Sequence, residues 1–112
     1  MKKTRLVLSD AAVADILEQA DWYTAESGAT LAKRWEKAVS SAVLRVVKNP
    51  AAGSLCTFRS SELRNVRRAK IRGFSKHLVF YKFHEDEVFI LRIVHGARDL
   101  ERLLEPNRSA PR

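Results

Sequence analysis

Basic side chains are concentrated in one short stretch of the sequence. Between positions 64 and 76 the chain carries six lysines and arginines and no acidic residue. They are Arg64, Arg67, Arg68, Lys70, Arg72 and Lys76. A surface of this kind suits the phosphates of a nucleic acid or the carboxylates of an acidic protein. A run of charges can equally be a solvated face that binds nothing.

Other groups that could do chemistry are sparse. The single cysteine, Cys56, cannot form an internal disulfide or a thiolate metal site by itself. The three histidines, His77, His84 and His95, lack the close spacing of metal ligands. The four glycines form no phosphate-binding loop. We therefore expect no metal and no cofactor.

Length and composition indicate one small domain over residues 1–112. The chain has a formal net charge of +8, and 46% of its residues are hydrophobic, which is typical of a folded protein with one modest core. No apolar run approaches the ~20 residues of a membrane-spanning helix. The basic N-terminus is followed only by the apolar residues 6–8, which is too short for a signal peptide. We expect a cytoplasmic protein with no membrane association.

The first half of the chain predicts a strand followed by two helices. Residues 4–8 read as the strand, and Ser9 or Asp10 can cap a helix over 11–26. Its apolar stripe is Val13, Ile16, Leu17, Ala20 and Tyr23, with Asp15, Glu18 and Asp21 on the wet face. Gly28 ends this helix. A second helix spans about 30–48 and ends at Asn49-Pro50, so the two form an antiparallel hairpin.

The second half predicts a loop over 49–65 and then three strands. The strands cover 67–72, 77–84 and 87–95, and short turns between them make an antiparallel meander. In the last strand we expect Val88, Ile90 and Val94 on one face and Phe89, Leu91 and Ile93 on the other. Because both faces are apolar, this strand is either central or open to a partner. A short helix over 97–105 and a frayed tail over 106–112 complete an α+β fold, a helical hairpin on a small antiparallel sheet.

Four segments in this order resemble the RelE/ParE superfamily of toxins from type II toxin–antitoxin systems. They are residues 8–12, 49–53, 76–81 and 90–100 (Leu-Ser-Asp-Ala-Ala, Asn-Pro-Ala-Ala-Gly, Lys-His-Leu-Val-Phe-Tyr and Ile-Leu-Arg-Ile-Val-His-Gly-Ala-Arg-Asp-Leu). The resemblance covers about residues 5–104 and is greatest to the ParE branch, whose members are often called plasmid stabilisation proteins. It implies one of two activities: RelE-like members cut mRNA in the ribosome, whereas ParE-like members inhibit DNA gyrase.

The resemblance also implies candidate site residues. If the chain is a ribonuclease, its catalytic residues by position are Arg68, Lys70, His77 and Arg98. RelE-like members carry a tyrosine in the C-terminal helix where this chain has Leu104, which argues against RNA cleavage. If the chain binds a target such as gyrase, the contact surface is the basic strand and the segment after the last strand. Its residues are Arg68, Lys70, Arg72, Arg92, Arg98 and Arg102.

Several of these side chains also have a purely structural interpretation. His77 can begin a strand with its ring in solvent, and His95 can order the turn before Gly96. Arg98 and Asp99 can form a local ion pair of little energetic value. Trp22 and Trp35 are interpreted as helix-packing residues, and Tyr81 as part of the core.

We thus carry three functional hypotheses. The first is a ParE-like toxin that inhibits gyrase by binding alone, and the second is a ribosome-dependent mRNA endoribonuclease. The third is a non-toxic relic that binds only an antitoxin. In each case the resemblance implies a cognate acidic antitoxin in a hetero-oligomeric complex, and the charge of +8 suits such a partner.

Overall fold

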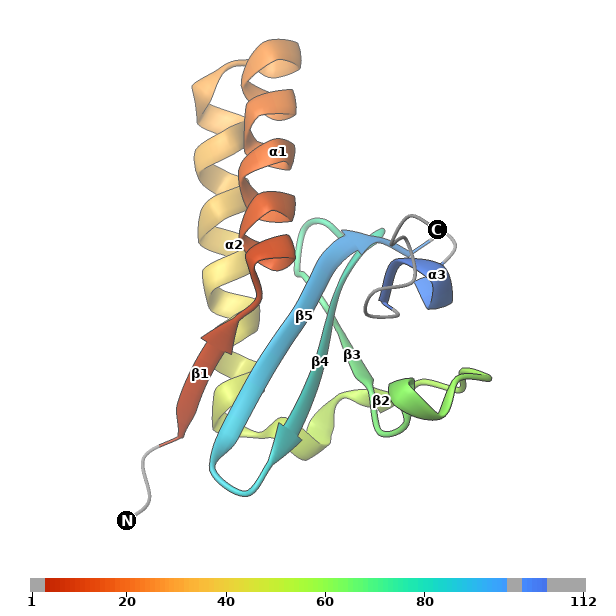
Figure 1. The fold of residues 1–112 in the computed structure, drawn as a ribbon. Coiled ribbons are helices and arrows are strands. Elements are labelled where there is room, and N and C mark those ends of the chain that lie inside the picture. The colour runs from red at the N-terminus through yellow and green to blue at the C-terminus, as the bar shows by residue number, and fades with distance from the viewer. Residues whose placement is uncertain (1–3, 97–99, 105–112) are drawn as a thin grey trace.

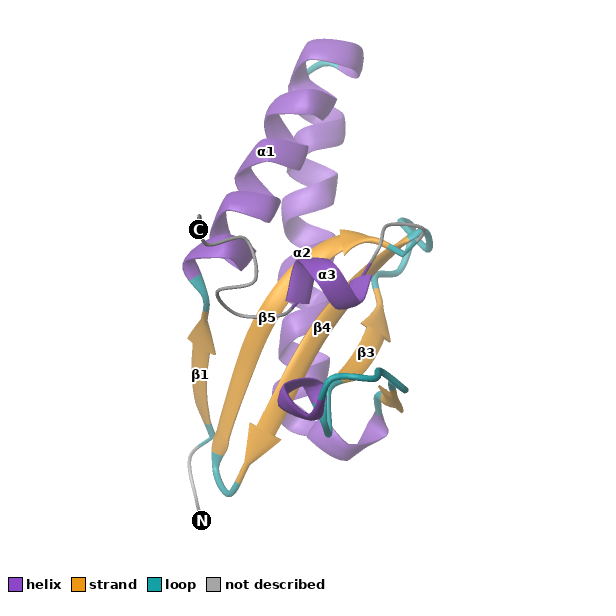
Figure 2. Ribbon diagram, turned by 45° about the vertical axis from the view of Figure 1, so that its right-hand side comes forward, coloured by secondary structure: helices purple, strands orange, loops and turns teal. Residues whose placement is uncertain are grey.

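The computed structural model describes residues 4–96 and 100–104 of the chain. Two long helices, α1 (Asp10–Ser27) and α2 (Ala29–Lys48), form an antiparallel hairpin against one face of a five-stranded sheet. The short helix α3 (Leu100–Leu104) packs on the opposite face (Figures 1 and 2). The α+β architecture is therefore confirmed. The predicted helix over 97–105 is observed as α3, while positions 97–99 and 105–112 lie outside the described residues.

The helical hairpin begins and turns at the positions that the sequence indicated. The Ser9 hydroxyl accepts a hydrogen bond from the Ala12 amide and caps α1. Gly28 separates the helices at φ +88°, a conformation that costs a glycine little. The predicted apolar stripe of α1 is only partly correct, since Val13 is 41% and Leu17 is 55% exposed.

The sheet has the order β1-β5-β4-β3-β2. The predicted meander is confirmed as β3 (Arg67–Lys70), β4 (His77–His84) and β5 (Glu87–His95), which pair antiparallel. The sheet predicted as antiparallel is mixed, because β1 (Arg5–Leu8) pairs parallel to β5. The intervening hairpin supplies the long connection that parallel pairing requires.

The loop predicted over 49–65 contains three short elements. Two are 3₁₀ turns, η1 (Pro50–Ala52) and η2 (Ser61–Leu63). The third is the two-residue strand β2 (Ser54–Leu55), which pairs with Arg67 and Arg68 at the N-terminal end of β3. Beyond this short pairing, the edge of β3 faces the side of α2 instead of another strand.

A β-bulge in β5 changes which side chains face the helices. Tyr81 lies opposite Ile90, but its neighbour Phe80 lies opposite Arg92, so Leu91 is the extra residue. The faces predicted for Ile93 and Val94 are therefore exchanged. Ile93 packs under the helices, and Val94 packs toward α3.

Two apolar clusters hold the layers together. The larger lies between the helices and the sheet and includes Trp35, Val79, Tyr81 and Ile90. The smaller lies under α3 and consists of Leu63, Val66, Phe80, Val94 and Leu104. β5 is thus a central strand with packing on both faces, one of the two predicted alternatives. Among the described helices, none has both the length and the apolar character needed to cross a bilayer.

Candidate target-binding surface

The basic residues of β3 project from an accessible edge of the sheet. Ala69 packs against the larger core, so the alternation of a strand directs Arg68 and Lys70 to the opposite face, the side of α3. Both side chains are exposed, as is Arg72 just beyond the strand. Among the described residues, none of these three forms an ion pair with a carboxylate. Their charged groups are therefore available to bind a partner.

These side chains line a groove of about 650 Å³ between the edge of β3 and the end of α2. One wall is the segment 49–54, which Tyr81 holds in place. The Tyr81 hydroxyl donates to the Pro50 carbonyl at 2.7 Å and accepts from the Gly53 amide at 3.0 Å. Arg67 adds a hydrogen bond of 2.7 Å to the Gly53 carbonyl.

Tyr81 has a structural role at this groove. Its side chain is fully buried, as the sequence predicted for a core residue. Burial raises the pKa of the phenol, an effect that outweighs the hydrogen bond from Gly53 and the nearby Arg67 charge. The neutral hydroxyl therefore remains available as the donor to Pro50.

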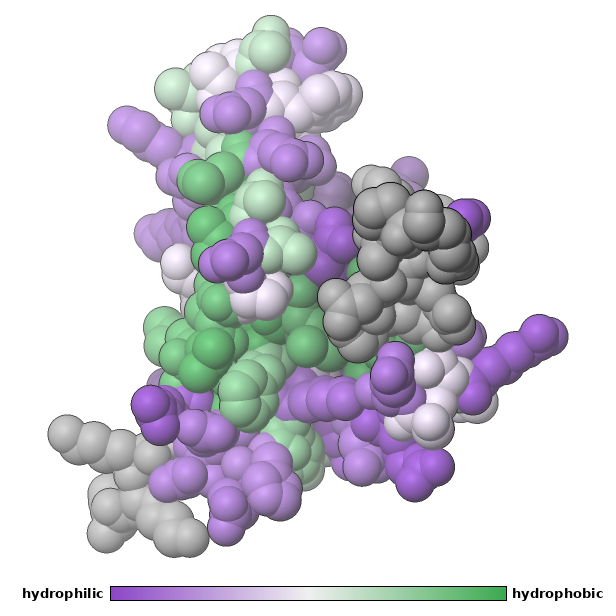
Figure 3. Space-filling model, viewed as in Figure 1, coloured by the Kyte–Doolittle hydropathy of each residue, from purple (hydrophilic) through white to green (hydrophobic). Residues whose placement is uncertain are grey.

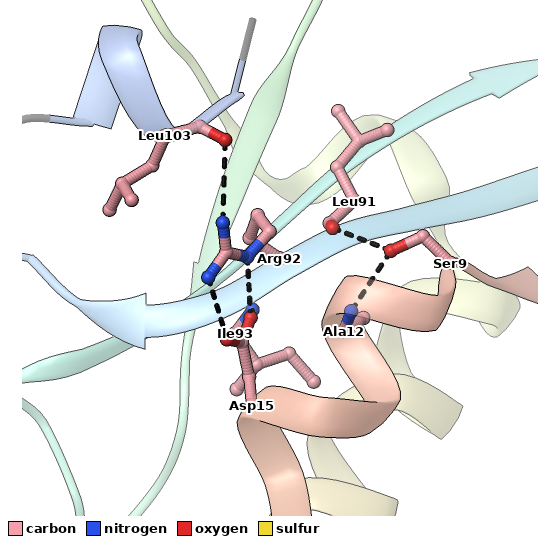
Figure 4. Close-up of polar contacts among 7 residues, drawn as sticks. All are labelled: Ser9, Ala12, Asp15, Leu91, Arg92, Ile93 and Leu103. Carbon is pink, nitrogen blue, oxygen red and sulfur yellow. Dashed lines mark hydrogen bonds and ion pairs between the residues drawn. The ribbon is translucent and has the colours of Figure 1, made fainter. Parts of the chain in front are cut away.

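Arg92 is bound within the molecule. Its Nε and Nη2 atoms donate to the two carboxylate oxygens of Asp15 at 2.8 Å, and Nη1 lies 3.4 Å from the Leu103 carbonyl (Figure 4). Asp15 also accepts from the Ile93 amide at 2.9 Å. The Arg92 side chain is 21% exposed, and its hydrogen bond with Asp15 raises its pKa further. It therefore links β5 to α1 and α3.

The expectation that Asp15 lies on the wet face of α1 was wrong. Its side chain is only 9% exposed because it turns toward the bulge of β5. Ser9 supports the same bulge, since its hydroxyl donates to the Leu91 carbonyl at 2.7 Å (Figure 4). Two residues of the α1 start thus hold the irregular part of β5.

His77 lies on the other face of the sheet from Arg68 and Lys70. Its ring is half-buried and packs edge-on against Trp35, with ring centroids 4.9 Å apart. His95 lies across the strand pair at 5.6 Å. Burial, together with the nearby His95, lowers the pKa of His77. Its ring is thus only partly in solvent, and the three candidate ribonuclease residues that the structure describes, Arg68, Lys70 and His77, do not lie in one site.

A groove beside His77 lacks the basic lining of the groove at the β3 edge. It has a volume of about 460 Å³ and runs between α1 and β5. Its charged lining residues are Asp15 and Glu18, and no lysine or arginine lines it among the described residues. The bases of β3 and the histidine pair therefore line different grooves.

Two candidate arginines lie at the C-terminal end of the described chain. Arg102 is exposed on α3, on the same side of the sheet as Arg68 and Lys70. Its neighbour Glu101 accepts hydrogen bonds from the Arg59 and Ser60 amides at 3.1 Å each. These bonds hold α3 against the loop over residues 49–65. Arg98 and its proposed partner Asp99 lie outside the described residues.

The other groups singled out in the sequence are Cys56, the possible metal ligands and the two tryptophans. Burial raises the pKa of the Cys56 thiol more than Arg68 lowers it, so the thiol is not activated. Throughout residues 4–96 and 100–104, no three His, Cys, Asp or Glu side chains gather as they would around a metal ion. Trp35 is buried as predicted for a packing residue, whereas Trp22 is 57% exposed.

Sequence reasoning missed the contribution of α2 to the basic surface. Arg45 lines the same groove as Arg68 and Lys70, and its Nη2 atom lies 3.4 Å from the Lys70 carbonyl. The available signal was the recurrence of cations at positions 34, 37 and 45, which helical periodicity places on one side of α2.

Comparison with known proteins supports one family. The chain matches the family model described as "ParE toxin of type II toxin-antitoxin system, parDE" over residues 6–100. A solved structure described as the chromosomal ParDE TA system from P. aeruginosa is similar in fold. Its TM-score is 0.68 at 18% identity, over 82% of this chain and 95% of the other. No curated protein matches. Because the family model spans most of the chain, the protein belongs to the ParE toxin family of type II toxin–antitoxin systems.

Proposed function

We propose that this toxin inhibits DNA gyrase by binding and that a cognate antitoxin neutralises it. The observation that carries the proposal is the separation of the bases from the histidines. Arg68 and Lys70 project on the α3 side of the sheet, whereas His77 packs against Trp35 on the helix side. A ribonuclease needs its acid, its base and its phosphate-binding cations within reach of one phosphate. The resemblance to the ParE branch supports gyrase as the target, and a gyrase inhibitor would act in the cytoplasm.

The C-terminal helix supports binding over catalysis. Leu104 occupies the position where RelE-like members carry a tyrosine, and it is buried in the smaller core with 7% exposure. An apolar side chain packed there cannot donate or accept a proton. The described residues of α3 therefore support the sheet and present Arg102 to solvent.

The proposed gyrase contact is the exposed basic surface on the α3 side and at the β3 edge. It comprises Arg68, Lys70, Arg72 and Arg102, with Arg98 as the adjoining residue expected from the sequence. Arg92 contributes chiefly through its ion pair with Asp15, which holds β5 under α3. Electrostatic attraction by such a surface speeds association and fixes orientation.

The proposed antitoxin site is an apolar surface on the other side of the molecule. Figure 3 shows apolar residues gathered over β1 and the adjoining parts of α1 and α2. The large apolar side chains exposed on these elements include Leu6, Val7, Val13, Leu17 and Leu44. β1 is also an outer strand of the described sheet. One of its edges therefore has no neighbouring strand there and can pair with a strand of a partner. An antitoxin that covers this surface and carries acidic residues would match both the apolar area and the charge of +8.

A supercoiling assay with a charge-reversed variant tests the gyrase contact. The variant Lys70→Glu/Arg72→Glu removes two exposed cations, and we expect at least about a tenfold loss of inhibition. The control Lys33→Glu/Arg64→Glu makes the same change in net charge at exposed positions that do not line the groove. Equal inhibition by wild type and the first variant, with both folded, would contradict the proposed contact. Codon-linked cuts in the mRNA of expressing cells would instead support the ribonuclease hypothesis. Expression of the protein without any effect on growth would support the non-toxic relic.

A further inference from the structure

A second groove continues the basic surface from β3 onto α2. It has a volume of about 360 Å³ and is lined by Arg34, Lys37, Arg45 and Arg72. The groove at the β3 edge is lined by Arg45, Arg68, Lys70 and Arg72. Because Arg45 and Arg72 line both, the two grooves form one continuous path. We call its six cations (Arg34, Lys37, Arg45, Arg68, Lys70 and Arg72) the cationic track.

The charge of the cationic track is not compensated. No aspartate or glutamate lines either groove among the described residues. None of the six cations pairs with a carboxylate in that part of the chain. The groove between α1 and β5 has only Asp15 and Glu18 as charged side chains. The six cations of the track therefore create a local potential that attracts anions.

The length of the track fits a polyphosphate rather than one phosphate. Arg34 and Arg45 are eleven positions apart on α2, which corresponds to roughly 16 Å along the helix. Consecutive base pairs advance about 3.4 Å along a duplex, so this distance matches about five of them. A single small anion would need only one end of the track.

The two aromatic residues that line the grooves of the track, Phe74 and Tyr81, pack into the core. Phe74 packs its ring against Trp35 and Tyr23, with centroids 5.3 and 5.6 Å apart. Tyr81 is fully buried. Proteins that hold single strands combine cations with exposed aromatic rings, whereas contacts to a duplex backbone need only the cations.

From these observations we infer that the cationic track binds the phosphate backbone of duplex DNA without reading its sequence. The inference goes beyond gyrase inhibition, because it assigns to the toxin its own affinity for DNA. Arg34 and Lys37 extend this site away from the proposed gyrase contact. The track shares Arg68, Lys70 and Arg72 with that contact, so in a toxin bound to gyrase Arg34, Lys37 and Arg45 would remain for the DNA that the enzyme holds.

Fluorescence anisotropy with a labelled 20-base-pair duplex and no gyrase tests the inference. For the refolded full chain we expect the logarithm of the binding constant to fall with the logarithm of salt concentration with a slope of about −5 for six phosphate contacts. The variant Arg34→Glu/Lys37→Glu should reduce that slope by about 2 and weaken binding roughly 50-fold at 0.1 M salt. The control Lys33→Glu/Arg64→Glu should bind within about threefold of wild type, because it carries the same net charge but an intact track.

Three results would overturn the inference. They are the absence of duplex binding at low salt, equal weakening by both variants, and binding of a 20-nucleotide single strand at least as tight as that of the duplex. If the Arg34→Glu/Lys37→Glu variant fails to fold by circular dichroism, the neutral variant Arg34→Gln/Lys37→Gln gives the same comparison with a smaller loss. Because gyrase is absent, failure here leaves the proposed gyrase inhibition intact, and failure of that inhibition leaves this result intact.

Discussion

Asp15 and Arg92, 77 positions apart in the sequence, form a two-pronged ion pair with both N–O distances at 2.8 Å. The same carboxylate accepts the backbone amide of Ile93. One side chain of α1 thereby fixes the arginine and the backbone that follow the bulge at Leu91. This bulge sets the faces of the residues after it, including His95, which pairs with His77. The Asp15–Arg92 pair therefore keeps the histidines on one side of the sheet and Arg92 on the other.

Substitution Asp15→Asn should destabilise the fold by about 2–3 kcal/mol. The change leaves a largely buried guanidinium without its counter-charge and weakens the bond to the Ile93 amide. Urea unfolding monitored by tryptophan fluorescence measures the loss. Asp21→Asn, at an exposed position of the same helix, is the control and should change stability by less than about 0.5 kcal/mol. Similar values for the two variants would show that the ion pair does not hold β5.

Substitution Gly53→Ala, in the wall of the basic groove, should lower the free energy of unfolding of the protein by about 2–3 kcal/mol. A β-carbon at Gly53 would clash with the Tyr81 hydroxyl and lie 2.8 Å from its ring carbon Cζ. The backbone at Gly53, with φ −67° and ψ 154°, is open to alanine, so the cost is steric. Because Tyr81→Phe removes the hydroxyl, the double variant should cost less than the sum of the single variants, as measured by chemical unfolding. Strict additivity would contradict this contact.

The stability of the protein should fall as the pH is lowered below about 6.5, in part because of His77. Burial and the adjacent His95 lower the folded-state pKa of His77, so between its folded and unfolded pKa values the unfolded chain binds more protons. The contribution is fully present above the unfolded pKa and is lost as the pH falls through the folded pKa. Urea midpoints at several pH values should show a weaker dependence for His77→Gln. The exposed His84 provides the control His84→Gln, which should keep the wild-type dependence, and identical profiles for all three proteins would contradict the assignment.

Polar substitutions on α1 should weaken antitoxin binding without affecting gyrase inhibition. Val13→Ser/Leu17→Ser removes two exposed apolar side chains from the proposed antitoxin surface. If both are buried in the complex, the loss corresponds to about 10- to 100-fold in affinity, measurable by calorimetry with the cognate antitoxin. The control is Leu55→Ser, which removes an equally exposed leucine from β2. Unchanged affinity of the α1 variant would place the antitoxin elsewhere.

Local signals in the sequence were sufficient for most of the fold. Ser9, Gly28 and Asn49-Pro50 mark helix ends through capping and steric rules that act over a few residues. The aromatic and β-branched residues of 77–84 and the alternation in 87–95 likewise predicted the hairpin of β4 and β5. The parallel pairing of β1 was missed because it joins segments that are distant in sequence. β2 was missed because two residues carry no periodicity.

The candidate site was harder to predict because it depends on register. A strict alternation assumed for 87–95 ignored the bulge, so Ile93 and Val94 were assigned to the wrong faces. Asp15 read as a solvent-facing acid because its partner is remote in the sequence. The charge of Arg68, Lys70 and Arg72 was visible directly. Their separation from His77, and their continuation into Arg45, arise only when the strands and α2 are packed together.

A gyrase supercoiling assay with purified, refolded toxin separates gyrase inhibition from RNA cleavage. Supercoiling should be lost and cleaved linear DNA should accumulate. The variant Lys70→Glu/Arg72→Glu should weaken this effect, whereas Lys33→Glu/Arg64→Glu should not. Unaffected gyrase at micromolar toxin, together with ribosome-dependent cutting of mRNA in the same preparation, would contradict the account and identify the protein as a ribonuclease.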